Sequence, residues 1–233
     1  MCRMAGFSSK SGINLIHIIE PVKHMAKYGL EAPHNDGWGM IGLSETYKLQ
    51  YQSINPIYED LLILDLNNII STAAYKLGIV HARLASEGLP KTTLQLHPFY
   101  INGKYFAHNG TIKSALKNNV YSSDTFEYFE SISSFGSLGE LSELIRFYSQ
   151  KHTFSGMNFL MVDELDRALY VCCLYAPSDK NEKYYTLYYK KSNGTFFVFS
   201  EKIIQESFPM KNGELFKVID GEIVEKTNIF IAI

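Results

Sequence analysis

The sequence predicts a single domain of layered α+β structure. Its 233 residues have the length of one large domain, and no internal repeat, low-complexity stretch or Pro/Gly-rich linker divides them. Strand-like segments gather in two groups along the chain, and the segments between the groups have helical patterning. This order favours separate sheets and helices packed in layers over an alternating strand–helix–strand winding.

The first half of the chain holds the first group of strands. The short apolar run Cys2–Phe7 is typical of a buried strand, and Ile13–Tyr28 is patterned as a helix that ends at Gly29. Asn55-Pro56 caps and opens a helix that we expect to continue to about Lys76. The other predicted strands of this half are Gly37–Leu43 paired with Tyr47–Ile54, then Ile79–Leu84, then Tyr100-Ile101 and Tyr105–His108 joined by a hairpin turn at Asn102-Gly103.

The second half opens with two predicted helices and continues as strands. The helices are Asp124–Ser134 and Leu138–Lys151, and in the first of them Asp124 and Glu127 have capping-box spacing. From Gly156 onward the chain is strand-like almost throughout. Polar turns separate the strands expected at Asn158–Val162, Leu169–Tyr175, Tyr184–Lys190 and Phe196–Phe199, and Asp220-Gly221 closes a last hairpin.

Composition excludes several classes of protein. With 22 Lys and Arg against 24 Asp and Glu, the net charge of −2 provides no electrostatic footprint for nucleic acid or an anionic membrane. The longest apolar run, Ala168–Ala176, is nine residues long, whereas a membrane-spanning helix needs about 20. No secretory signal opens the chain, and an odd count of three cysteines fits a reducing compartment. We therefore expect a cytoplasmic protein with no nucleic-acid or membrane partner.

Cys2 is the first candidate for a catalytic residue. Removal of Met1 would leave it with a free α-amine, whose pKa is about 7.7–8.0, beside a thiol whose pKa is about 8.5. One residue would then hold a nucleophile and its general base, as in N-terminal-nucleophile enzymes. The simpler interpretation is a small apolar residue in a first strand, because most free cysteines are buried and inert.

Three further positions carry groups suited to an amino-acid ligand. Arg83 has the donor geometry that best holds a carboxylate, although a structural ion pair is the commoner reason for such an arginine. Asn109-Gly110 offers a side-chain amide and a backbone N–H, which are the components of an oxyanion hole or of an ordinary turn. Asp124, at the start of a helix, can accept hydrogen bonds from an ammonium group or cap the helix.

The sequence indicates neither a metal nor a cofactor. Four histidines stand near these segments, but none has the i, i+4 or Cys-x-x-Cys spacing of a metal site. Cys172 and Cys173 are adjacent in a predicted strand, so they point to opposite faces and are expected in the core. No segment has the spacing of a phosphate-binding loop.

Taken in order, these segments resemble the class II glutamine amidotransferases, which are N-terminal-nucleophile hydrolases. The resemblance covers about Met1–Glu130 and extends more thinly to Phe199-Ser200-Glu201. It implies one four-layer αββα domain over residues 1–233, with Met1 removed. The segments that carry it are Met1-Cys2-Arg3, Asp36-Gly37-Trp38-Gly39, His81-Ala82-Arg83-Leu84-Ala85-Ser86, His97-Pro98-Phe99, His108-Asn109-Gly110 and Ser123-Asp124-Thr125.

The resemblance also implies a role for each site residue. Cys2 would attack the side-chain amide of glutamine, with its own α-amine as base and then acid. The other implied roles are an oxyanion hole at the Asn109 side chain and the Gly110 N–H, an α-carboxylate site at Arg83 assisted by Ser86, and an α-ammonium site at Asp124.

The chain departs from the family pattern at two positions. Leu96 stands where many members have Asn before His-Pro-Phe, and Glu87 stands where several have His. The Met-Cys-Arg start is closer to the free-standing branch of the family, which includes enzymes that cleave γ-glutamyl amides in larger thiol compounds.

The predicted function is cleavage of glutamine or a related γ-glutamyl amide through a Cys2 thioester, with release of ammonia or an amine. One alternative is a subunit that supplies ammonia to a separate synthase, because this length leaves no room for a second reaction. Another is a catalytically idle binding domain, for which Leu96 and Glu87 are the support. The tyrosine-rich segment 184–189 could cover a sheet edge or an interface, which leaves a homo-oligomer open.

Overall fold

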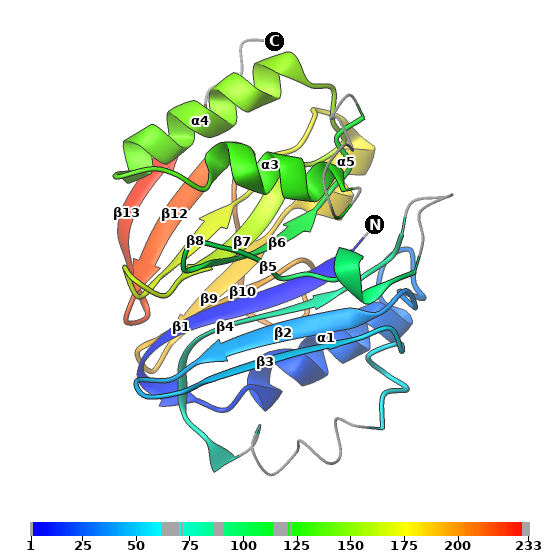
Figure 1. Cartoon of the computed structure of the whole chain (residues 1–233), viewed down its shortest axis with the longest axis vertical. Coiled ribbons are helices and arrows are strands. Elements are labelled where there is room, and N and C mark those ends of the chain that lie inside the picture. The colour runs from blue at the N-terminus through cyan, green and yellow to red at the C-terminus, as the bar shows by residue number, and fades with distance from the viewer. Residues whose placement is uncertain are drawn as a thin grey trace.

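The structure is a computed structural model that describes residues 2–61, 70, 72–85, 91–113, 121 and 123–229. Within these residues the chain forms two antiparallel sheets that pack face to face (Figure 1). The first sheet has the strand order β11-β9-β10-β1-β4-β2-β3. Its strands are β1 (Arg3–Ile13), β2 (Trp38–Leu43), β3 (Lys48–Ser53), β4 (Tyr75–Ala82), β9 (Tyr188–Ser192), β10 (Thr195–Phe199) and β11 (Phe208–Pro209).

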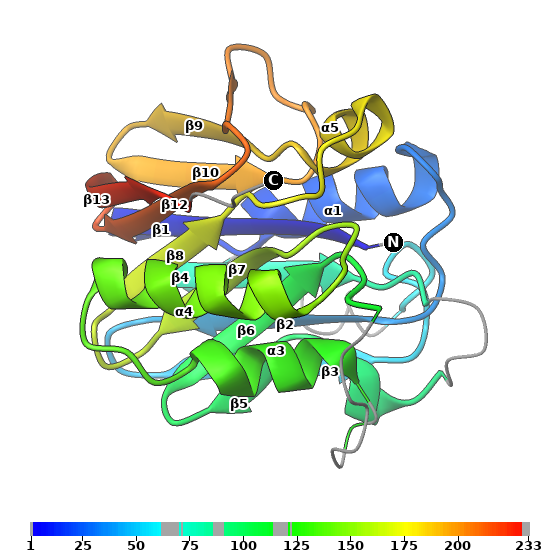
Figure 2. The ribbon, with the colours of Figure 1, turned by 90° about the horizontal axis from the view of Figure 1, so that it is seen from above.

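The second sheet has the order β13-β12-β8-β7-β6-β5. Helices cover the outer face of each sheet, and α3 and α4 lie side by side over the second one (Figure 2). The strands are β5 (Phe99–Ile101), β6 (Lys104–Asn109), β7 (Asn158–Asp163), β8 (Ala168–Cys172), β12 (Glu214–Ile219) and β13 (Glu222–Asn228). The helices are α1 (Ile16–Tyr28), α3 (Asp124–Ile132), α4 (Leu138–Lys151) and α5 (Asp179–Tyr185), with a 3-10 turn at Thr93–Gln95.

The inner strands β2, β4, β7 and β8 are buried on both faces, and successive strand residues supply the two faces in turn. On β4, Ile79 lies in the core between the sheets, whereas Val80 lies in the core under α1. Cys172 and Cys173 divide in the same way between the core under α3 and α4 and the core between the sheets, which confirms their prediction as core residues on opposite faces.

Several predicted elements are confirmed. Helix α4 has the predicted bounds, Leu138–Lys151, and β2 pairs with β3 as expected. Asn102 and Gly103 have φ angles of 47° and 83°, the left-handed values that a two-residue hairpin turn requires. Asp220-Gly221 makes the same kind of turn between β12 and β13.

Three predicted details are wrong. The strand expected at Tyr184–Lys190 begins only at Tyr188, because Ser178 caps the short helix α5, whose first turn carries Asp179 and Glu182. The helix expected from Asn55 to Lys76 does not reach that end, since β4 starts at Tyr75, and most of its middle lies outside the described residues.

The third correction concerns the cap of α3. Its N-cap is Ser123, whose Oγ accepts a hydrogen bond from the Phe126 N–H, and Asp124 is the first helical residue. The Asp124 side chain is therefore not the N-cap of α3, and its carboxylate accepts a hydrogen bond from the Ile112 N–H in a neighbouring loop.

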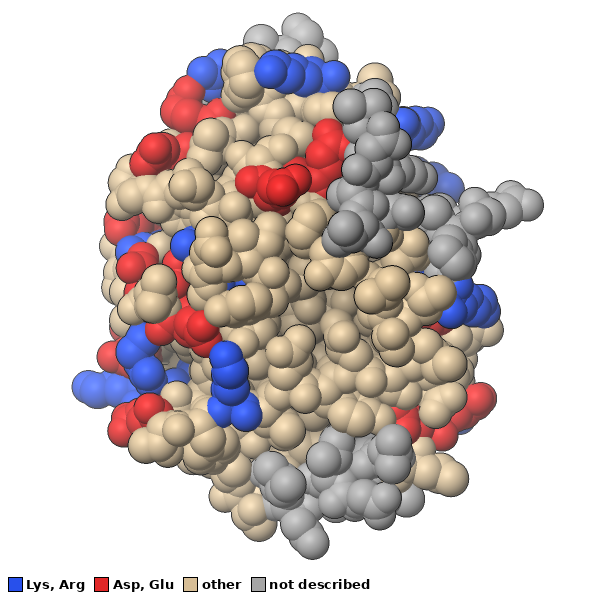
Figure 3. All heavy atoms as spheres, in the orientation of Figure 1, with Lys and Arg blue, Asp and Glu red and all other residues tan. Residues whose placement is uncertain are grey.

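No helix in the described part of the chain combines the length and the apolar character that crossing a membrane requires. On the face drawn in Figure 3, acidic and basic side chains are interspersed around the margin of a largely uncharged centre. That face carries no broad field of either sign, which agrees with the small net charge of −2.

Candidate active site

Strand ends from both sheets meet at one cavity. In the antiparallel pair of β1 and β4, Arg3 is opposite Ala82, so Cys2 and Arg83 extend from neighbouring strand ends on the same side of the first sheet. Asn109 ends β6 in the second sheet, and Asp124 starts α3. The cavity is lined by Cys2, Arg83, Leu84, Ala85, Gln95, His97, His108, Gly110, Ser123, Asp124 and Thr125.

Cys2 is joined to Asn109 by a direct hydrogen bond. The Cys2 N–H donates to the Asn109 Oδ1 over 3.1 Å, and the Cys2 thiol lies 3.9 Å from the Leu84 carbonyl oxygen. Because Oδ1 faces a donor, the amide nitrogen of Asn109 points the other way. This Nδ2 is fully buried and has no hydrogen-bond partner among the described residues. It is an oriented donor beside the predicted nucleophile.

Gly110 cannot carry a side chain in this fold. A Cβ at this position would lie 1.8 Å from the Gly156 carbonyl oxygen, well inside contact distance, and the φ of Gly110 is +157°. Gly156 is itself packed against the Tyr185 ring, which a Cβ would meet at 2.7 Å. Two glycines therefore allow the loop after β6 to run close to the loop before β7, with Gly110 at the cavity wall.

Arg83 is buried at the cavity wall and is held by two elements. Its backbone N–H donates to the Gly37 carbonyl oxygen over 2.8 Å, and its carbonyl oxygen accepts from the Asp36 N–H over 3.1 Å. Its guanidinium donates to the Gln95 Oε1 over 2.9 Å. The glycine-rich turn that contains Asp36 thus fixes the backbone of Arg83, and Gln95 orients its side chain.

Gln95 is a site residue that the sequence reasoning missed. It is 6 % exposed, lines the cavity, and also donates from Nε2 to the Tyr121 carbonyl oxygen over 3.1 Å. The one sequence feature that could have identified Gln95 is its position two residues before His97. A neutral amide in an irregular segment belongs to no periodic pattern that would mark it as a site residue. Leu96, one of the two departures from the family pattern, is a buried residue whose carbonyl oxygen accepts from Gln52 over 2.7 Å.

Asp36 is an ionised group close to Arg83. Burial raises its pKa, but the ion pair with Lys91, the Ala85 N–H and the charge of Arg83 together outweigh burial and hold the pKa below its usual value. The Asp36 carboxylate therefore stays charged and anchors the Ala85 backbone at the cavity.

Asp124 lies at the cavity with two backbone donors on its carboxylate. Oδ2 accepts from the Ile112 N–H and Oδ1 from its own neighbour, the Thr125 N–H, each over 2.9 Å. These bonds orient the carboxylate between the loop after β6 and the start of α3. Ser86 and Glu87, which the sequence associates with the same site, lie outside the described residues.

Three buried histidines lie in contact beside the site, and two of them, His97 and His108, line the cavity. His81 Nε2 lies 3.1 Å from the His108 carbonyl oxygen and 3.0 Å from His97 Nδ1. Since a carbonyl oxygen only accepts, His81 carries its proton on Nε2, and His97 Nδ1 is the acceptor. The His108 N–H, 3.4 Å away, also donates to His97 Nδ1, which leaves the Nε2–H of neutral His97 as its donor.

Burial keeps all three rings neutral. It lowers the pKa of His81 to about 3 and that of His108 to about 4, and it holds the pKa of His97 well below the usual value. His108 is fixed by Thr125 on one ring nitrogen, over 2.8 Å, and by the Gly156 carbonyl oxygen on the other. Among the described residues, no group of three or more His, Cys, Asp or Glu is arranged to hold a metal ion.

The fold is that of class II glutamine amidotransferase domains. Among solved structures, a glutamine aminotransferase class-II domain protein from Silicibacter pomeroyi matches with a TM-score of 0.67 and 17 % identity, over 99 % of this chain and 100 % of that one. A predicted glutamine amidotransferase from Pseudomonas aeruginosa PA01 matches with a TM-score of 0.52 and 16 % identity, over 96 % and 100 % of the two chains.

A larger enzyme contains the same fold. The allosteric regulatory enzyme of purine biosynthesis matches with a TM-score of 0.67 and 18 % identity over 100 % of this chain, which spans 50 % of the length of that enzyme. At these identities the likeness concerns the fold. No protein-family model and no curated protein matches the chain.

Proposed function

We propose that the protein cleaves the side-chain amide of glutamine, or of a related γ-glutamyl compound, through a thioester on Cys2. The observation that carries the proposal is the contact of Cys2 with Asn109, whose buried Nδ2 has no hydrogen-bond partner in the described part of the chain. The cavity adds a cation and an anion, Arg83 and Asp124, which match the two charged groups of an amino acid. The match to class II glutamine amidotransferase domains supports the same chemistry.

The first half of the reaction forms the thioester. Once Met1 is removed, the α-amine of Cys2 takes the thiol proton, and the sulfur bonds to the amide carbon while the carbonyl electrons move to oxygen. The Asn109 Nδ2–H and the Gly110 N–H hold this oxyanion, and each such donor contributes about 2.7–4 kcal/mol to transition-state stabilisation. The C–N bond then breaks, and the leaving nitrogen takes the proton from the α-ammonium, so ammonia or an amine departs.

The second half regenerates the enzyme. Water attacks the thioester carbon while the α-amine of Cys2 accepts a proton from it, the carbon–sulfur bond breaks to release glutamate, and the α-ammonium returns its proton to the leaving sulfur, which restores the thiol and the amine. Arg83 binds the α-carboxylate with help from Ser86, and Asp124 binds the α-ammonium throughout. We also propose that the two covered sheets constitute the four-layer αββα sandwich of N-terminal-nucleophile hydrolases, and that residues 1–233 act as one domain.

Substitution of the nucleophile tests this proposal. Cys2→Ala should lower glutamate release from glutamine or a γ-glutamyl compound by at least about 10³-fold, because no other group can form the thioester. Cys172→Ala is the matched control, since that thiol is buried under α3 and α4, and it should keep the rate. Full hydrolysis by Cys2→Ala would end the proposal. Intact-mass measurement on active protein should show Met1 absent, and its retention would remove the α-amine from the mechanism.

A second candidate is a subunit that delivers ammonia to a separate synthase. Its support is that this chain spans half of the larger purine-biosynthesis enzyme. It predicts slow turnover of glutamine by the isolated protein, so a high stand-alone rate without any ammonia acceptor would contradict it. An idle binding domain, the remaining alternative, predicts that an electrophilic glutamine analogue leaves Cys2 unlabelled.

A further inference from the structure

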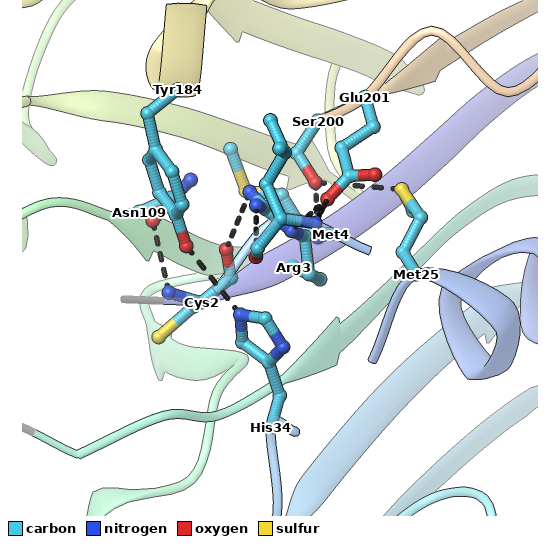
Figure 4. Close-up of polar contacts among 10 residues, drawn as sticks. Cys2, Arg3, Met4, Met25, His34, Asn109, Tyr184, Ser200 and Glu201 are labelled. Atoms are coloured by element: carbon cyan, nitrogen blue, oxygen red, sulfur yellow. Dashed lines mark hydrogen bonds and ion pairs between the residues drawn. The ribbon is translucent and has the colours of Figure 1, made fainter. Parts of the chain in front are cut away.

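An ion pair between a fully buried arginine and a glutamate whose side chain is 14 % exposed lies beside the predicted nucleophile (Figure 4). The Arg3 side chain is 0 % exposed, and its Nε lies 2.5 Å from the Glu201 Oε1. Arg3 is the first residue of β1, and Glu201 follows β10, which pairs with β1 in the first sheet. The pair therefore fixes the strand end from which Cys2 extends.

The guanidinium has three further contacts. It donates to the Leu30 carbonyl oxygen over 2.7 Å and reaches the Cys2 carbonyl oxygen at 3.5 Å. Its plane lies over the Tyr184 ring, with 4.1 Å from the guanidinium carbon to the ring centre. Figure 4 shows Arg3 between the Tyr184 ring and the Glu201 carboxylate, with Cys2 on the side of Asn109.

The same contacts tie three chain segments together. Glu201 Oε1 also accepts from the Leu30 N–H over 2.8 Å, which joins the segment after α1 to the turn after β10. The next residue of β1, Met4, is bonded to the residue before Glu201: the Met4 N–H donates to the Ser200 Oγ over 3.0 Å. The Ser200 N–H donates back to the Met4 carbonyl oxygen over 3.0 Å.

Stability alone does not account for such a pair. Removing two charges from water offsets most of their mutual attraction, so well-packed apolar residues in the same place are often as stable. The first residues of a chain, by contrast, fray unless they are tied down. A planar guanidinium that contacts a carboxylate, two backbone carbonyl oxygens and an aromatic ring is suited to define where a chain end lies, and a small displacement of a nucleophile lowers its rate strongly.

We propose that Arg3 and Glu201 are positioning residues for the Cys2 nucleophile. They hold the Cys2 backbone where its nitrogen meets Asn109 and its sulfur faces the cavity. This inference rests on the proposed function of Cys2, and it assigns to Arg3 and Glu201 a role in placement rather than in contact with substrate.

The chain offers a matched control in a second buried ion pair. Lys104 and Asp163 lie 3.2 Å apart with side chains 12 % and 4 % exposed, at the opposite end of β6 and β7 from Asn109. Asp163→Asn removes a charge from this pair as Glu201→Gln does from the other. The two variants should lose similar stability to urea, and only Glu201→Gln alters the pair that includes Arg3, the residue next to the nucleophile.

The test compares both variants in two measurements. The first is amide hydrogen exchange in the peptide that covers residues 2–8, which needs no substrate. The second is the rate at which an electrophilic glutamine analogue labels Cys2, divided by the rate with iodoacetamide, read by mass spectrometry. Glu201→Asp, which keeps the charge, serves as the rescue variant and as the substitute if Glu201→Gln folds poorly.

We expect Glu201→Gln to speed exchange at the start of β1 and to lower the labelling ratio about tenfold or more, with partial recovery in Glu201→Asp. Asp163→Asn should leave both measurements at the wild-type value. Equal exchange in the two charge-removal variants would overturn the inference. Wild-type protein that reacts with iodoacetamide but not with the analogue would instead contradict the proposed function, and the exchange result would still decide the role of the pair.

Discussion

At the scale of single residues, Asn109 and Gln95 use the same chemical group in different ways. The Asn109 amide oxygen accepts from the Cys2 N–H, and its buried nitrogen has no partner within the residues that the structure describes. Leaving a buried donor unsatisfied costs about 1–3 kcal/mol, so it indicates a group held for a ligand. The Gln95 amide has both ends occupied, by Arg83 and by Tyr121, and so acts through the arginine that it orients.

Gln95 gives the residue-scale prediction. Gln95→Leu removes the acceptor of Arg83, and Gln95→Glu supplies an internal carboxylate that competes with the substrate carboxylate. Each should raise KM for the amide substrate about tenfold, equivalent to about 1.4 kcal/mol, and leave kcat within about twofold. Steady-state kinetics measure both constants.

Gln52→Leu is the control for that experiment. Gln52 also donates from Nε2 to backbone carbonyl oxygens, those of Leu96 and Pro98, and makes no contact with Arg83 among the bonds that the structure shows. It should change stability without changing KM. A KM shift of the same size in Gln52→Leu and Gln95→Leu would show that Gln95 has no particular link to substrate binding.

At the scale of elements, close approach between two loops decides what the site can tolerate. The loop after β6 contacts the loop before β7 through Gly110 and Gly156, with no space for a Cβ. Gly139 lies in the exposed first turn of α4. A Cβ at this position would meet one described atom beyond the helix backbone, the Ser137 Oγ, at 3.9 Å. The same substitution should therefore have opposite effects at the two positions.

Gly110→Ala should destabilise the protein by about 1–3 kcal/mol or more, because the loops must separate, and should slow labelling of Cys2 by a glutamine analogue. Gly139→Ala should stabilise it by about 0.4–1 kcal/mol, since alanine reduces the freedom of the unfolded chain and fits a helix. Urea unfolding of both variants measures the two effects. A stable Gly110→Ala protein with normal labelling would contradict the close-approach argument.

At the scale of the whole molecule, buried histidines join the two sheets. His81 lies on β4 of the first sheet, and its ring bonds to the His108 carbonyl oxygen on β6 of the second. Burial depresses the pKa of both rings and of His97, so the unfolded chain takes up protons at a higher pH than the folded one. Their contribution to stability is full above the unfolded pKa of about 6.5 and declines as the pH falls towards 4 and below.

The resulting prediction is a stability that falls below pH 6.5. Between pH 6.5 and 5, each histidine should add up to about 1.4 kcal/mol per pH unit to the slope of the unfolding free energy. Urea unfolding across this range measures the slope, and His97→Asn should reduce it. His17→Gln, at an exposed position of α1, should leave it unchanged. An equal slope in His97→Asn and wild type would contradict the role given to burial.

Local patterns in the sequence were sufficient for most of the elements. Helix 138–151 and the turns at Asn102-Gly103 and Asp220-Gly221 depend on apolar spacing, a serine cap and residues that accept positive φ, all of which are short-range properties. The tyrosines of segment 184–190 predict a strand throughout, but Ser178 and the acidic first turn of α5 extend a helix to Tyr185, and the strand begins only at Tyr188. Five of the six predicted site residues, Ser86 being outside the described residues, lie around one cavity or hydrogen-bond to Cys2.

The sequence by itself determined the identity of the chemical groups: a cysteine after Met1, an Asn-Gly after a strand, an arginine at a strand end and an aspartate at a helix start. Only the tertiary structure decided how they act together. Residues 2 and 109 meet through the packing of two different sheets, and the partners Gln95 of Arg83 and Glu201 of Arg3 are supplied by chain folding. Hydrogen bonds and ion pairs depend on distances of about 3 Å, and spacing along a chain does not encode such distances between segments a hundred residues apart.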